Sequence, residues 1–277
     1  MTNLTTATTA TTTATTTTMG TPPPDRRYGT TQAVRAELTK LRSVRSTSWT
    51  LLVTVLGALV VTILVTLHTA HRPNRQFQGF DPTNQSLTGL ALGSLIIGVL
   101  GVLAVTGEYA SATIRSTLAA TPRRGLLLGA KVIVVGAVSL VVGELLTFAC
   151  FFTGQGILSG NAPSASIGQP GVLRALVLTG AYLALLALFG LGLGLIIRHT
   201  SGAIATFVGF TLLLPILLQP LSNNWSRFAP ESILANSVAA VVPQTGQLSA
   251  TTGFLMMGLY CLVVLALGRA LLVRRDA

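Results

Sequence analysis

Long apolar runs recur along this chain and constrain its fold more than any other feature. A bilayer core of ~30 Å is crossed by about 20 apolar helical residues, and the backbone groups inside it must be hydrogen-bonded within the segment. Hydrophobic residues make up 50% of the 277 residues and charged residues only 9%, against about a quarter in soluble domains. The fold class is therefore an all-α membrane protein. The six transmembrane helices are predicted at residues 49–67, 87–106, 126–152, 172–197, 203–221 and 254–273.

The region before the first span divides into two parts. Residues 1–30 are a Thr/Ala tract followed by prolines, a composition too poor in large apolar groups to pack, which predicts a disordered tail. The transmembrane domain is predicted to cover residues 31–277. In its segment 31–48, Val34, Leu38 and Leu41 recur at helical spacing between basic residues, which indicates an amphipathic helix at the membrane interface. The alternative is a basic flank without a helix of its own.

Basic residues predict the orientation of the chain, because cytoplasmic loops carry an excess of Lys and Arg. With the N-terminus inside, fourteen of the 18 basic residues are cytoplasmic and four are outside. We therefore predict a multi-pass protein of the plasma membrane with both termini in the cytoplasm. The net charge of +11 is explained by this topology, and without a soluble domain to carry a basic surface no nucleic-acid partner is expected.

The sequence holds no recognisable catalytic constellation. Gly-x-Ser-x-Gly, His-Glu-x-x-His and paired-carboxylate motifs are all missing. A phosphate-binding loop requires Gly-Lys-Ser/Thr, yet neither Lys40 nor Lys131 follows a glycine. Cys150 and Cys261 lie in apolar runs, where a thiol behaves as a small hydrophobe. We expect no catalytic residue, metal or cofactor in this chain, and no ATP hydrolysis by the chain alone.

Two features within the predicted spans carry further expectations. Glu144 and Arg174 approach similar depths in neighbouring spans, so we expect either an ion pair between helices or a carboxylate that lines a translocation path. The sequence leaves both alternatives open. The glycine cluster 190–194 and the pair Gly89 and Gly93 are typical of close helix packing in membranes.

The loop at residues 107–125 is the only predicted internal loop long enough to present a surface to a partner. Its first half combines apolar and charged residues and could form a short helix, which ends near Pro122. Such a loop suits docking to a soluble protein. The alternative is a basic loop that only determines topology.

Two stretches resemble a known family. The segment GEYASATIRSTLAATPRRGLLLGAK, beginning at Gly107, resembles the intracellular loop and third-helix start of permease subunits of type-2 ATP-binding-cassette (ABC) exporters. The segment ELTKLRSVRSTSWTLL, beginning at Glu37, resembles the same family's elbow helix and first span. The resemblance covers roughly residues 32–277.

The resemblance implies a permease subunit that forms the translocation path of an ATP-driven export system. It implies two such chains, as a homodimer or a related heterodimer in membrane lipid, and a separate ATP-binding cassette subunit that holds ATP and Mg²⁺. The internal loop would be the coupling helix. Its candidate coupling residues are Glu108, Tyr109, Arg115, Arg123 and Arg124. The alternative function is a non-transporting membrane sensor or immunity protein whose loop binds a regulatory partner.

Overall fold

The computed structural model describes residues 29–43, 45–71, 80–113, 124–160, 162–218, 227–238 and 248–275. Within these ranges the chain forms helices and their connections, without a strand. The helices are α1 (Thr30–Ser43), α2 (Arg45–Ala70), α3 (Pro82–Ser86), α4 (Leu90–Ala110), α6 (Arg124–Leu158), α7 (Val172–Ile197), α8 (Thr200–Val208), α9 (Leu214–Leu218), α11 (Pro230–Ser237) and α12 (Ala250–Arg275), with a π-helical segment at Gly209–Leu213 between α8 and α9.

The prediction of six membrane-spanning helices is confirmed. In the described part of the chain, six helices are long and apolar enough to cross a bilayer: Ser48–Ala70, Leu90–Ala110, Arg124–Leu158, Val172–Ile197, Thr200–Leu217 and Ala250–Arg274. The fourth has the bounds that the sequence predicted. The third continues six residues beyond the predicted end at 152.

Polar Gln155 lies in that extension of α6 and is satisfied there by protein groups. Its amide nitrogen donates to the Pro82 carbonyl at 2.9 Å and to Ser86 Oγ at 2.8 Å. Its Oε1 accepts from the backbone N–H of Ala165 at 2.6 Å. A residue that reads as the polar end of an apolar run therefore fastens α6 to α3.

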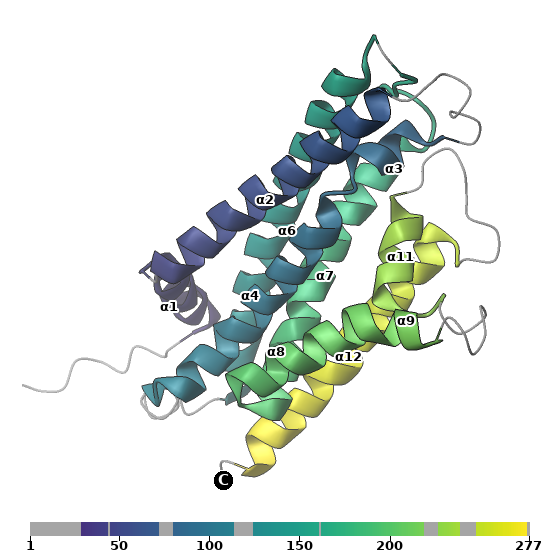
Figure 1. Ribbon diagram of the computed structural model, residues 1–277. Coiled ribbons are helices and arrows are strands. Elements are labelled where there is room, and N and C mark those ends of the chain that lie inside the picture. Colours follow the sequence, from purple (N-terminus) through teal and green to yellow (C-terminus); the bar gives the residue numbers. More distant parts are fainter. Residues whose placement is uncertain are drawn as a thin grey trace, which may run out of the picture.

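Helix α7 is the centre of the molecule. It packs most extensively against α4, α6 and α12, and Figure 1 shows it running through the middle of the bundle. In its most apolar window 67% of the residues are buried, against 22% for the first span and 17% for the fifth. The outer helices therefore leave much of their apolar surface for lipid or another chain.

Glycines allow this close packing, as predicted from the cluster 190–194 and from Gly89. A Cβ on Gly101 of α4 would lie 1.9 Å from the Ala187 carbonyl oxygen of α7. A Cβ on Gly190 would lie 2.2 Å from the Gly98 carbonyl oxygen, and one on Gly89 would lie 2.0 Å from that of Ala58. No side chain fits at these crossings.

The two ends of the bundle differ in the elements that they carry. Helix α1 and the C-terminal end of α12 lie at one end, which we call the α1 end, and α3 and α11 lie at the other, the α3 end (Figure 1). The six spans run from just after α1 to the C-terminal end of α12, and this even number returns the chain to the end at which it began. Asp81 caps α3 by accepting hydrogen bonds from the backbone N–H groups of Thr83 and Asn84.

The fifth span is continuous but irregular. The π-helical segment Gly209–Leu213 lies between α8 and α9, and Pro215 follows in the first turn of α9. Proline has no backbone N–H and cannot complete a regular α-helical ladder, and a π-helical turn absorbs the mismatch. The adjacent Leu213, Ile216 and Leu217 are exposed, whereas Thr211 is buried, so one side of the irregular part faces outward.

Candidate functional site

Four charged residues from three helices meet at the α1 end of the bundle. We call Glu37 and Lys40 of α1, Glu108 of α4 and Lys131 of α6 the charge cluster. Lys131 Nζ lies 2.6 Å from Glu37 Oε2 and 2.6 Å from Glu108 Oε1. Lys40 Nζ lies 2.6 Å from the same Glu108 oxygen and 3.5 Å from Glu37 Oε1. A single network of ion pairs therefore joins α1, α4 and α6.

The positions of these residues on their helices explain how they meet. Glu37 and Lys40 are three residues apart and share one face of α1. Glu108 lies in the last turn of α4, and Lys131 lies about two turns into α6. Lys131 also donates to the Ala104 carbonyl at 3.2 Å. The end of α4 is thus bound both to α1 and to α6.

Burial makes the charges of the cluster dependent on one another. Glu37 is 5% exposed, Glu108 6% and Lys131 5%, whereas the Lys40 side chain is 37% exposed. Two carboxylates and two ammonium groups balance, so the cluster as a whole carries no net charge. Removal of one partner from a buried ion pair leaves an uncompensated charge, which is strongly destabilising.

Lys40 lies outside the spans, and its pKa responds to the charges of the cluster. Burial alone would lower the pKa of Lys40, but its hydrogen bond to Glu108 and the negative charges of Glu108 and Glu37 outweigh burial and raise that pKa. The ammonium form is therefore favoured in the folded protein.

The sequence placed Glu108 and Tyr109 in the internal loop, and this placement is wrong. Both lie in α4, which continues to Ala110. The ion pairs of Glu108 account for the extra turn, because they allow this carboxylate to be buried. Of the other predicted coupling residues, Arg115 and Arg123 lie outside the described residues, and Arg124 begins α6.

Two arginines fasten the α1 end around the cluster. The Arg198 guanidinium lies 5.3 Å from the centre of the Tyr109 ring and donates to the Leu271 carbonyl at 3.1 Å. Arg124 Nη1 donates to the Leu272 carbonyl at 3.0 Å. The end of α4, the turn between α7 and α8, the start of α6 and the end of α12 are therefore held together.

Glu144 and Arg174 do not pair with each other in the structure. Arg174 is exposed. Glu144 lies against α7, where a Cβ on Gly180 would meet its carboxyl carbon at 2.4 Å. Among the described residues, Glu144 Oε2 is buried without a hydrogen-bond partner. The ion-pair alternative is not formed, and the path-lining alternative stays a prediction.

Sequence reasoning missed Glu37 and the pairing of Lys131. From the sequence, Lys131 is noted only as a lysine that does not follow a glycine, and Glu37 only as the first residue of the segment that resembles the elbow helix. The available signal was the charge of Lys131 inside an apolar run, which requires a buried anion.

In the described part of the chain, no group of three His, Cys, Asp or Glu residues could hold a metal ion.

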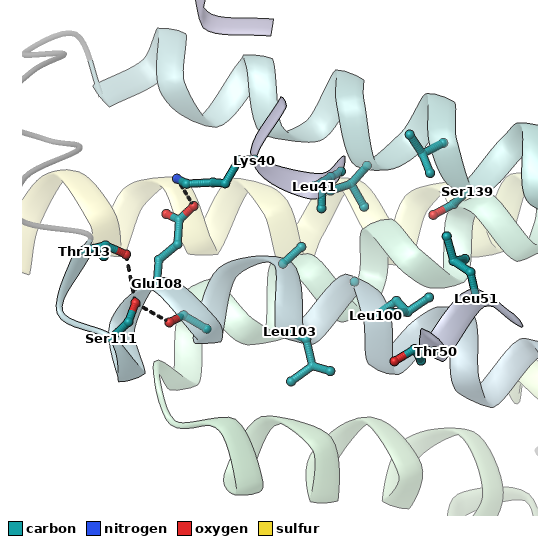
Figure 2. Close-up of a pocket in the computed structure, with 15 residues that line it drawn as sticks. Lys40, Leu41, Thr50, Leu51, Leu100, Leu103, Glu108, Ser111, Thr113 and Ser139 are labelled. Atoms are coloured by element: carbon teal, nitrogen blue, oxygen red, sulfur yellow. Dashed lines mark hydrogen bonds and ion pairs between the residues drawn. The ribbon is translucent and has the colours of Figure 1, made fainter. Parts of the chain in front are cut away.

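A cavity of about 470 Å³ adjoins the cluster, between α1, α2, α4 and α6. Figure 2 shows Lys40, Glu108, Ser111 and Thr113 together at one end of it, with leucines farther along. Its wall is otherwise mostly apolar, from Leu41, Leu51, Leu100, Leu103, Val135 and Val138. The cavity therefore has a polar end at the α1 end of the bundle and an apolar body within it.

The fold defines a polytopic α-helical membrane protein with a charged junction at one end. A family model described as ABC-2 family transporter protein matches residues 33–214, from α1 to the first residue of α9. This match covers well over half of the 277 residues, and the chain belongs to that family. A comparison with curated proteins found no match.

Proposed function

We propose that this chain is the permease subunit of an ATP-driven export system, in which a separate cassette subunit binds and hydrolyses ATP with Mg²⁺. Two permease chains, identical or related, enclose the path in this proposal. The α1 end faces the cytoplasm with both termini, as the distribution of basic residues favours. The family membership supports the permease role.

The charge cluster is the observation that carries this proposal. It binds the last turn of α4 to α1 and α6, and α4 and α6 are the two helices that the internal loop connects. A displacement of that loop therefore acts on three helices together. A junction of this kind suits a chain that receives force from a soluble partner.

The proposed mechanism is a rigid-body switch driven from the cytoplasmic side. Closure of the cassettes displaces the internal loop and, through Glu108, the junction of α1, α4 and α6. Because α7 packs on both α4 and α6, the displacement reaches the centre of the bundle. The permease halves then alternate between inward-open and outward-open states.

The first test is co-purification of this chain with a candidate cassette subunit, followed by ATPase measurements in lipid. We expect Arg115→Ala and Arg123→Ala to weaken assembly or to uncouple ATPase activity from the permease. Arg174→Ala is the matched control, because this exposed arginine begins the fourth span near the α3 end. It should leave assembly and activity unchanged.

A well-folded wild-type chain that neither binds nor regulates a cassette subunit would contradict the proposal. That result would favour the non-transporting sensor or immunity protein. Equal effects of all three substitutions would instead show that the internal loop has no special part in coupling.

A further inference from the structure

The Glu108 carboxylate can accept a further hydrogen bond at the polar end of the cavity. Its Oε1 accepts hydrogen bonds from Lys40 and Lys131 at 2.6 Å each. Among the described residues its Oε2 is buried and has no hydrogen-bond partner. A buried carboxylate oxygen without a donor is costly, and Glu108 lines the cavity. A ligand with an N–H or O–H group would satisfy it there.

Lys40 adds a complementary positive group beside this oxygen. It lines the same cavity, and its side chain is 37% exposed, so its ammonium can also contact an anion. A free acceptor oxygen and a part-exposed ammonium at one site match a zwitterion, with its own ammonium on Glu108 and its anion on Lys40. A ligand with a single charge would make only one of the two charged contacts.

The position of the cavity indicates that such a ligand is a lipid. Trp49 is exposed at the start of α2, as expected for an aromatic residue at the membrane interface. From Glu108 the cavity extends along α4 to Leu100, about 12 Å at the helical rise per residue. Leu103 is exposed, so an acyl chain bound there can continue into the bilayer.

We propose that this cavity binds one zwitterionic phospholipid with a primary ammonium head group, such as phosphatidylethanolamine. The ammonium donates to Glu108 Oε2, the phosphate lies by Lys40, and an acyl chain lies against Leu51, Leu100 and Val135. A second cavity of about 460 Å³, between α7, α8 and α12, has no charged residue in its lining and offers no such head-group site. The proposal does not rest on the transport function.

The test compares phosphatidylethanolamine with phosphatidylcholine carrying the same acyl chains. Both head groups are zwitterionic, but the quaternary ammonium of phosphatidylcholine has no N–H to donate. Delipidated full-length protein in mild detergent is mixed with both lipids, and the bound lipid is counted by native mass spectrometry. We expect one phosphatidylethanolamine to bind about tenfold more tightly, the effect of one hydrogen bond to a charged group.

Variants that fill the cavity keep the test independent of the charge cluster. A Cβ on Gly107, which lines the cavity, meets nothing within 4 Å. Gly107→Leu and Ser139→Leu should both abolish the preference without breaking an ion pair. Gly156→Leu is the matched control, because this glycine is also unobstructed but does not line the cavity.

Three results would overturn the proposal. The first is equal binding of the two lipids by the wild-type protein. The second is a preference that persists in both cavity-filling variants. The third is equally tight binding of phosphatidylglycerol, which would show that an anion on Lys40 with a hydroxyl donor to Glu108 is sufficient and that the site does not require an ammonium group.

Discussion

At the scale of single residues, the charge cluster shows how a membrane protein accommodates ionisable groups near its core. Lys131 is the common partner of Glu37 and Glu108, and both carboxylates are buried. The cluster loses its neutrality when any single one of its four charges is removed. Its stability is therefore a property of the set and cannot be assigned to one pair.

Lys131→Met should lower the free energy of unfolding by about 3–5 kcal/mol, the usual cost of breaking a buried ion pair. The reason is that two buried carboxylates then share only Lys40. Thermal unfolding in detergent measures the loss. The double variant Glu37→Gln/Lys131→Met should recover part of it, because Glu108 and Lys40 remain as a balanced pair. A double variant less stable than Lys131→Met would contradict this account.

At the scale of helices, contact between backbones holds α4 against α7. Gly101 faces the Ala187 carbonyl at a distance that admits no Cβ. Backbone groups cannot swing away as a long side chain can, so a methyl group at this crossing must separate the two helices. Because α7 also packs on α6 and α12, a separation at this crossing disturbs the centre of the bundle.

Gly101→Ala should therefore destabilise the protein by about 1–3 kcal/mol, the range of overpacked cores. Gly129→Ala is the control, since a Cβ there meets nothing within 4 Å. It should be neutral or slightly stabilising, because alanine favours helix more than glycine does. Thermal unfolding of both variants under identical conditions provides the comparison, and equal losses would refute the proposed backbone contact.

Helix α11 carries a titration that can be measured. Burial raises the pKa of Glu231 above its ordinary value of 4.5, so the folded protein retains this proton more strongly than the unfolded chain. As pH rises past the unfolded pKa, the unfolded state ionises first and stability falls until the folded pKa is passed. Above the folded pKa the deficit is complete.

Glu231→Gln should therefore raise the thermal stability at pH 7, and the gain should vanish below about pH 4, where the carboxyl group is protonated in both states. Melting temperatures of both proteins across this range measure the difference. A gain of equal size at both pH values would show that ionisation of Glu231 is not its cause.

Prediction from sequence succeeded where the residues of a single helix are enough to determine the feature. The apolar runs gave the six spans, and the small residues indicated close crossings at Gly89 and Gly190. It failed where a residue depends on a distant partner. Glu37 and Lys131 are 94 positions apart, and the extension of α6 depends on Gln155 meeting α3. Patterns within a segment carry no information on such pairings.

At the scale of the whole molecule, topology can be tested with the native cysteines left in place. Cys150 and Cys261 are buried, at 0% and 3% exposure, so they should react little with a membrane-impermeant maleimide. Gln32→Cys on α1 and Ser164→Cys near the α3 end both introduce exposed sites.

In intact cells we expect Ser164→Cys to be labelled and Gln32→Cys to be protected until the membrane is permeabilised. This outcome follows from the excess of basic residues at the α1 end. The opposite pattern would invert the orientation and place the internal loop outside the cell. Labelling of both variants in intact cells would contradict the odd number of spans, three, that separate them.

The distance along the chain between the partners of the cluster also bears on biosynthesis. Glu37 leaves the ribosome 94 residues before Lys131, so α1 is complete while its counter-ion has yet to be translated. A lysine entering the bilayer alone costs up to ~2.5–3.5 kcal/mol. Here it arrives beside carboxylates already present on α1 and at the end of α4. We therefore expect the N-terminal helix to assist insertion of the third span, so that chains without α1 integrate that span less efficiently.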